Sequence, residues 1–444
     1  MDVVTTRNLR SLSALQRFRT SLLMGMVVLV PLVMVLNLVA AWRAPVWSPR
    51  NELAHYDFID QIGRLRLPRP GDPISDYTYR ITTGGFTWKK PSGFDGSRES
   101  MGIEGLSYEV HQPPLYYTLM AIPNIWLKSR GEVPAVQIRL LRCVQVLVAG
   151  LGFLLLIPIF RELSVLGGFS TAYGVIAAVG MMLCNVGTYT TLGNDSFSAL
   201  FCNLAVLFHL RYWRRGAIAE LAGASFAVAG ALLVKHTNGL MLPLHLVSAA
   251  SFALSRHDGA ARKPLLIGAI PVFLLAISLV FNRLYFGRFL PLDVTEQYFE
   301  NVVTPTRGAW RLVRTLVLDS LTLRHLHFQW PPWAARYLLA MLALNTLLSG
   351  YRVLWLRARG GEVIVLICCL MSLSVIGSAL FLNTYKPGVW WSAFRHFYGY
   401  QVFWWIALFR VPIPLPARTA ARTAGVIGAG VALLVVWYVY LSMQ

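Results

Sequence analysis

The chain contains 444 residues, of which 56% are hydrophobic and only 14% are charged. Apolar runs close to the ~20 residues that cross a bilayer recur along its whole length. This composition excludes a soluble globular enzyme. It predicts an all-α polytopic membrane protein in which residues 1–444 form a single integral membrane domain. The 40 Lys and Arg outnumber the 20 Asp and Glu and give a net charge of +20, which in a membrane protein indicates cytoplasmic anchoring rather than nucleic acid as a partner.

The amino-terminal segment, residues 1–19, is basic and precedes the first apolar run, at residues 20–42. Loops rich in Arg and Lys stay on the cytoplasmic side of a membrane, so we expect a cytoplasmic amino terminus. The sequence predicts about eleven transmembrane helices in all. After the first, they are expected near residues 138–160, 170–190, 195–210, 217–234, 239–255, 264–282, 334–350, 361–382, 398–412 and 424–442.

The positions of arginine predict the orientation of these spans. We place Arg211, Arg214, Arg215 and the other basic clusters between spans on the cytoplasmic side. Counting residues 113–128 as a further span would move the Arg211 cluster to the outside, so this segment is not counted as one. We expect this segment to lie along the outer membrane surface, because its internal Pro123 makes it a poor spanning helix.

Nearly all remaining polar residues then fall on the outer face. The first periplasmic loop covers residues 43–137 and is expected to contain juxtamembrane helices, and further periplasmic loops cover residues 283–333 and 383–397. The first loop is expected to open with a surface helix over NELAHYDFIDQIGRL, because apolar residues recur there at helical spacing.

Four short motifs stand at these outer positions: NELAH, YEVHQPPLYY, GNDSFSAL and VKHTNGL. In this combination the chain resembles the GT-C superfamily, polytopic glycosyltransferases that use polyprenyl-phosphate sugars as donors. The resemblance implies a GT-C-like bundle and an inverting sugar transfer. Many relatives carry Asp-Glu at the start of the first motif, whereas this chain has Asn51 before Glu52. The resemblance therefore implies Glu52 as the catalytic carboxylate, with Asp57 as the reserve.

The chemistry gives its own reasons for these residue types. A base must take the proton of the acceptor hydroxyl, which suits a carboxylate, and the departing phosphate needs cations rather than an acid. The residues expected to bind the donor phosphate or other parts of the substrate are His55, His111, Gln112, Asn194, Asp195, Lys235, His236, Arg395 and His396. No cofactor is assigned, although Glu109 could join Glu52 in holding a divalent cation.

Each candidate also has a structural explanation. Glu52 could stabilise the start of a helix, and Lys235 could extend its amine from a span end to the membrane surface. Asn194 and Asp195 could form a turn and a helix cap, and Asp60 is expected on a solvated face.

Two other functional classes remain open. A lipid or lipid-linked-glycan transporter would carry charges within its spans, and the spans here are nearly charge-free. A membrane acyltransferase would need an intramembrane histidine, for which His209 and His245 are available, but neither has a polar neighbourhood in the sequence. The expected partners are a polyprenyl-phosphate sugar, a glycan or protein acceptor such as a pilin, and membrane lipids. The Arg-rich, Lys-poor balance is typical of a GC-rich bacterium and predicts an inner-membrane protein whose active site faces the periplasm.

Overall fold

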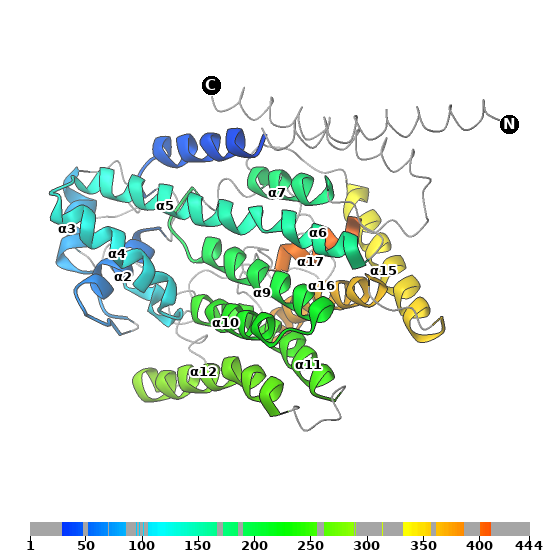
Figure 1. Ribbon diagram of the computed structural model, residues 1–444. Helices are drawn as coiled ribbons and strands as arrows, with labels where there is room; N and C mark the ends of the chain where they lie inside the picture. The colour runs from blue at the N-terminus through cyan, green and yellow to red at the C-terminus, as the bar shows by residue number, and fades with distance from the viewer. Residues whose placement is uncertain are drawn as a thin grey trace, which may run out of the picture.

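The computed structural model describes residues 29–47, 52–69, 71–85, 105–166, 172–184, 190–254, 262–287, 332–356, 361–385 and 400–409, together with residues 95, 97, 101, 289 and 313. These residues form helices and no β-strand, which confirms the predicted all-α class (Figure 1). The labelled elements follow an apolar helix, Leu29–Arg43. They are α2 (Glu52–Gly63), α3 (Asp76–Gly85), η2 (Tyr108–His111), α4 (Leu115–Ser129), α5 (Pro134–Leu154), α6 (Leu156–Leu166), α7 (Ala172–Cys184), α9 (Asp195–Arg215), α10 (Ile218–Val234), η3 (His236–Leu240), α11 (Met241–Leu254), α12 (Arg262–Phe286), α15 (Pro332–Leu354), α16 (Gly361–Tyr385) and α17 (Gln401–Phe409).

Three stretches of the described chain are long and apolar enough to cross a membrane: Pro134–Leu166, Arg262–Phe286 and Arg336–Leu354. Shorter apolar helices are Leu29–Arg43, Tyr173–Leu183, Ile218–Val234 and Glu362–Ser378. The total of about eleven spans therefore stays a prediction. The last expected span, residues 424–442, lies outside the described residues.

The span predicted at residues 138–160 consists of two helices. It begins at Pro134, and α5 ends at Leu154 before α6 starts at Leu156. Pro158 explains the break, because it has no N–H to donate to the Leu154 carbonyl and its ring crowds the preceding turn.

The bundle is organised around α9, which packs against α5, α6 and α10, while α10 packs in turn against α12 (Figure 1). The α5–α9 contact is close because α5 carries glycine there. A Cβ on Gly152 would lie only 2.9 Å from the backbone nitrogen of Leu200. Asn203 reaches across the same contact and donates to the Gly152 carbonyl at 2.8 Å. A small residue and one buried amide thus fix the two helices together.

The described part of the chain between the helix Leu29–Arg43 and α5 contributes to a second hydrophobic core, in which α2 packs against α4. The helix expected over residues 51–65 is confirmed, but α3, η2 and α4 pack against it, and every residue from Glu52 to Gln61 is buried. The helix expected near residues 113–128 is also present, as α4. Ile122, Ile125 and Trp126 form an exposed apolar side of α4, which suits a helix lying against lipid.

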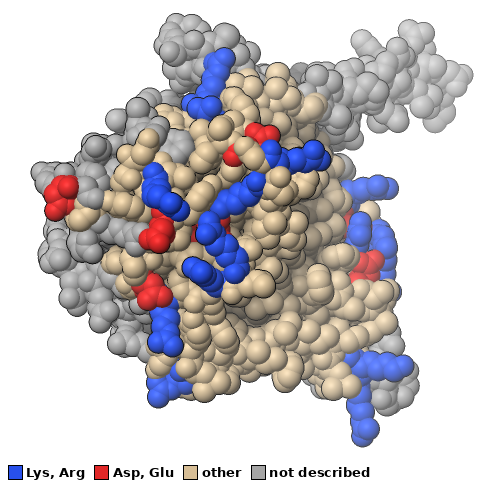
Figure 2. Space-filling model, turned by 90° about the vertical axis from the view of Figure 1, so that its left-hand side faces the viewer, with Lys and Arg blue, Asp and Glu red and all other residues tan. Residues whose placement is uncertain are grey.

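Figure 2 shows the side of the molecule on which α2, α3 and α4 lie in Figure 1. Basic and acidic side chains are interspersed there within a larger uncharged surface. The acidic groups of α2 are not part of this surface, because they are buried beneath it.

Candidate functional site

Glu52, the predicted catalytic carboxylate, is fully buried at the start of α2. Its Oε1 accepts hydrogen bonds from Arg142 Nε at 2.6 Å and from the backbone N–H of Leu192 at 3.1 Å. Its Oε2 accepts from Arg142 Nη2 at 2.5 Å and from the backbone N–H of Trp47 at 3.0 Å. The side chain therefore connects the loop after the first helix with α5 and with the turn before α9.

Arg142 lies inside the predicted span at residues 138–160, and its side chain is fully buried. Besides Glu52, its guanidinium donates to the carbonyls of Ala41, Ala44 and Pro45 at 2.7–3.3 Å. This buried charge corrects the expectation of nearly charge-free spans. A charged residue within an apolar run is itself a signal of a structural or functional site, so the sequence did contain the information that points to Arg142.

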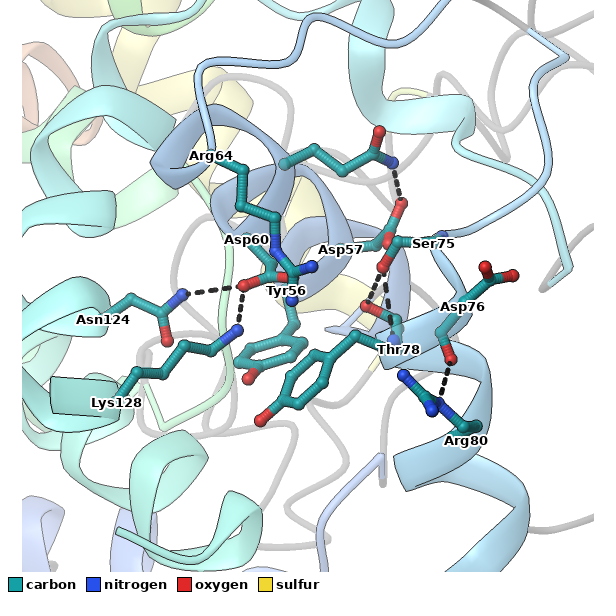
Figure 3. A network of polar contacts seen from close by, with 12 residues as sticks. Tyr56, Asp57, Asp60, Arg64, Ser75, Asp76, Thr78, Arg80, Asn124 and Lys128 are labelled. Atoms are coloured by element: carbon teal, nitrogen blue, oxygen red, sulfur yellow. Dashed lines mark hydrogen bonds and ion pairs between the residues drawn. The ribbon is translucent and has the colours of Figure 1, made fainter. Parts of the chain in front are cut away.

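Asp57, the reserve catalytic residue, is also fully buried. Its Oδ2 accepts from Gln61 at 2.6 Å and from the Ser107 hydroxyl at 2.5 Å, and its Oδ1 accepts from the backbone N–H of Ser75 at 2.9 Å. Ser75 leads into α3, as Figure 3 shows. Asp57 therefore joins α2 to the chain segments before α3 and before η2.

Asp60 points from α2 toward α4, away from Asp57 (Figure 3). It forms an ion pair with Lys128, Arg64 Nη2 lies 3.0 Å from its Oδ2, and Asn124 lies at hydrogen-bonding distance from its Oδ1. The expectation that Asp60 is solvated is wrong. Burial lowers the pKa of Lys128 from its usual value, and the nearby Asp60 carboxylate opposes that shift.

Two buried side chains hold the turn before α9. The backbone N–H of Gly193 lies 3.0 Å from both Tyr116 Oη and Gln145 Oε1, and Tyr116 donates to Gln145 at 2.9 Å. Gln145 also donates to the Thr191 carbonyl at 2.5 Å. This turn is therefore fixed by α4 and α5 together, next to the Leu192 N–H that binds Glu52.

The predicted residues at the start of α9 and the end of α10 do meet. Lys235 Nζ lies 2.5 Å from Asp195 Oδ1. The Asn194 side chain donates to Gln112 at 3.3 Å and to the Val234 carbonyl at 3.2 Å rather than capping α9. Lys235 is itself nearly buried, with 6% of its surface exposed, and so it does not extend into the surrounding water.

His55 and Glu109 complete this region. His55 Nδ1 lies 2.9 Å from the Tyr117 hydroxyl, and its ring stacks on the Tyr117 ring. His55 Nε2 lies 3.6 Å from Glu109 Oε1. A Cβ built on Gly193 would lie 3.6 Å from His55 Nε2, so this pair borders the turn before α9.

We use the name "outer polar cluster" for His55, Glu109, Gln112, Asn194, Asp195 and Lys235. Its members come from α2, η2 and its carboxyl end, α9 and the end of α10. Burial raises the pKa of the adjacent Tyr116 hydroxyl well above its usual value, and the negative charges of Glu52, Asp195 and Glu109 raise it further. The cluster thus brings together five of the predicted substrate-binding residues.

The other predicted residues are less fully described. His236 begins η3, directly after Lys235, and is partly exposed. His111 ends η2, but the position of its side chain lies outside the description. Arg395 and His396 lie outside the described residues. Within the described part of the chain, no three His, Cys, Asp or Glu side chains gather closely enough to hold a metal ion.

His209 and His245 do have a polar neighbourhood, contrary to the sequence-based expectation. His209 Nε2 lies 3.0 Å from His245 Nδ1, and His245 Nε2 lies 3.0 Å from the Ser225 hydroxyl. Ser225 donates to the carbonyl of Ile267 at 2.9 Å. The signal was missed because these residues come from four different helices.

Comparison with known proteins supports a membrane glycosyltransferase. Residues 131–281 match the model of a family described as dolichyl-phosphate-mannose-protein mannosyltransferase. This match confirms the predicted resemblance to the GT-C superfamily. No curated protein matches the chain. A solved structure, ArnT from Cupriavidus metallidurans in the apo state, is similar over 86% of this chain and 76% of its own, with 14% identity and a TM-score of 0.34.

Proposed function

We propose that this GT-C glycosyltransferase transfers a sugar from a polyprenyl-phosphate donor to an acceptor outside the cytoplasm. The acceptor classes are a glycan, a lipid-linked glycan or a secreted protein such as a pilin. The observation that carries the proposal is the outer polar cluster, because it combines a nearly buried cation with carboxylates and amides at one end of the bundle.

The donor phosphate is the group that this cation suits. In the proposed reaction, negative charge grows on the phosphate as its bond to the sugar breaks, and a cation held in a poorly solvated site stabilises that charge strongly. Lys235 would supply this charge, with Asn194 and Gln112 as hydrogen-bonding neighbours. We assign Arg395 and His396 to the same phosphate, and His111 and His236 to the remaining polar contacts of the donor.

Glu52 has a different part in this proposal from the one its sequence position suggests. Its four acceptor contacts fill the capacity of an ionised carboxylate, so a substrate hydroxyl would have to displace an existing bond. Glu52 as general base stays a prediction. The arrangement favours Glu52 and Arg142 as the pair that holds the outer polar cluster in place.

The orientation follows from the charges of the sequence. We place the cluster on the periplasmic side of a bacterial inner membrane, because the opposite end of α9 carries Arg211, Arg214 and Arg215 around Glu162. The apolar exposed side of α4 would then face the outer leaflet, where the polyprenyl chain of the donor lies.

The test begins with the purified full-length protein. Mass spectrometry of copurified lipid should detect polyprenyl phosphate or its sugar conjugate. Reconstituted protein should then release polyprenyl phosphate from at least one of a panel of synthetic donors carrying mannose, glucose, a pentose or an aminosugar. Absence of both polyprenyl-phosphate binding and donor turnover across the panel would reject the proposed function.

A further inference from the structure

The carboxylates around the outer polar cluster differ in how many acceptor positions remain open. An ionised carboxylate has roughly four lone-pair positions for hydrogen bonds. Glu52 uses four of them and Asp57 uses three, all with partners inside the protein. Neither can receive a proton from a substrate without first losing a bond that holds the outer loop together.

Two further carboxylates are paired with cations. Asp60 contacts both Lys128 and Arg64, and Asp195 contacts Lys235. The cations already occupy part of the acceptor capacity of both carboxylates. Asp195 also contacts Lys235, the cation that we assign to the donor phosphate. Binding of the phosphate requires Lys235 to stay charged.

Glu109 is the exception. Only 5% of its surface is exposed, yet within the described part of the chain its carboxylate has one polar contact, with His55 Nε2 at 3.6 Å. That separation is beyond a hydrogen bond. If the Tyr117 hydroxyl donates to His55 Nδ1, the remaining proton of neutral His55 lies on Nε2 and faces Glu109. Among the described residues, Glu109 is thus a buried carboxylate that faces the His55 ring and accepts no hydrogen bond.

The position of Glu109 suits the reaction. It lies in η2, and the backbone N–H of Gln112 donates to the Glu109 carbonyl at 2.9 Å. The Gln112 side chain continues to Asn194, which precedes Asp195 and its partner Lys235. A continuous set of contacts therefore connects Glu109 with the proposed phosphate site. The acceptor hydroxyl needs a negatively charged base on one side of the sugar. The departing phosphate needs a cation on the other side.

We infer that Glu109, rather than Glu52, is the general base of the transfer and that His55 is its positioning residue. This inference rests on the proposed function. Glu109 takes the proton of the acceptor hydroxyl while the oxygen electron pair forms the new bond to the anomeric carbon. The bond from that carbon to the phosphate oxygen breaks, and its electron pair leaves with polyprenyl phosphate. The products are the glycosylated acceptor, polyprenyl phosphate and a protonated Glu109, which returns its proton to water.

The first experiment compares three variants in the reconstituted protein, using the donor that wild type accepts. Glu109→Gln should lose turnover by about 100- to 10,000-fold, the range typical of a missing general base, while polyprenyl-phosphate binding and the melting temperature stay close to wild type. Glu109→Asp should retain part of the turnover. Asp76→Asn removes an exposed carboxylate from the same loop and should behave as wild type.

The second experiment measures the pH dependence of kcat/KM and chemical rescue. The pH profile of kcat/KM should differ between wild type and Glu109→Gln, because only the wild-type protein carries a carboxylate at this position. Added formate should restore turnover in Glu109→Ala by replacing the missing carboxylate. His55→Gln should shift the low-pH limb of the profile, which a residue with only a packing role would not do.

The outcomes separate the two proposals. If wild type turns over the donor and Glu109→Gln has near-normal turnover with an unchanged pH profile, this inference is overturned. The proposed function would then remain intact. A folded Glu109→Ala variant that formate does not rescue would also overturn it. Wild-type protein that neither binds polyprenyl phosphate nor turns over any donor would reject the proposed function itself.

Discussion

The side chains of Glu52 and Arg142 are fully hydrogen-bonded, partly to each other and partly to the surrounding backbone. The carboxylate accepts two bonds from the guanidinium and two from backbone N–H groups, and the guanidinium places five N–H contacts on Glu52 and three carbonyls. Five is the full donor capacity of arginine. A buried pair with this degree of satisfaction joins elements 90 residues apart and leaves neither partner available for another ligand.

The first prediction concerns the stability that depends on this pair. Glu52→Gln keeps the size of the side chain but leaves the Arg142 charge buried without its partner, which typically costs about 3–5 kcal/mol. We expect a clear fall in the melting temperature in detergent, whereas Asp76→Asn should leave it unchanged.

The alternative role of Glu52 makes a different forecast. A general base can be replaced by Gln with loss of turnover and little loss of stability. A Glu52→Gln protein that melts as wild type but transfers no sugar would therefore return the catalytic role to Glu52.

The second prediction concerns the donor phosphate. Lys235→Ala and Arg395→Ala should each weaken both polyprenyl-phosphate binding and turnover, because the charge on the phosphate increases as the reaction proceeds. Arg395→Lys keeps the charge but loses the planar pair of donors and should recover only part of the activity. Full binding of polyprenyl phosphate by both alanine variants would remove these residues from the site.

A third prediction uses two buried serines. Ser225 donates to the Ile267 carbonyl. In a regular helix this carbonyl would accept from the N–H of residue 271, but residue 271 is proline and has no N–H. Ser225→Ala leaves this carbonyl and His245 without that partner and should destabilise the protein by about 1–3 kcal/mol. Ser248 donates to the Leu244 carbonyl of its own helix, so Ser248→Ala should be close to neutral. Equal melting temperatures for the two variants would contradict this account.

The fourth prediction tests the orientation. A cysteine at position 80, in the exposed part of α3, and another at position 390 should react with an impermeant thiol reagent added from outside. A cysteine at position 214 should react only after the membrane is made permeable. Labelling of position 214 with protection of position 80 would invert the topology and remove the basis for a periplasmic site.

The sequence predicted local structure and motif locations well. Helical periodicity identified α2, and the internal Pro123 indicated that α4 is a separate helix rather than a membrane span. The motifs GNDSFSAL and VKHTNGL were expected at outer turns, and the structure brings Asp195 of one next to Lys235 of the other.

What the sequence did not predict depends on contacts between distant elements. The partners of Glu52 lie at positions 47, 142 and 192, and periodicity within one helix contains no information on such pairings. For the same reason, the sequence could not distinguish a carboxylate with occupied acceptor positions from Glu109, which accepts no hydrogen bond from the described residues. The interpretation of Asp60 as solvated failed because α4 covers it and supplies Lys128.

The bonds of Glu52 also constrain the order of biogenesis. Trp47 emerges early in synthesis, Arg142 follows with α5, and the Leu192 N–H exists only once the turn before α9 has been made. Until that point the amino-terminal helix and the outer loop carry a carboxylate whose final partners are missing. The outer loop therefore cannot reach its mature arrangement one segment at a time as the ribosome delivers it. The set of bonds to Glu52 is complete only when the chain has been made as far as residue 192.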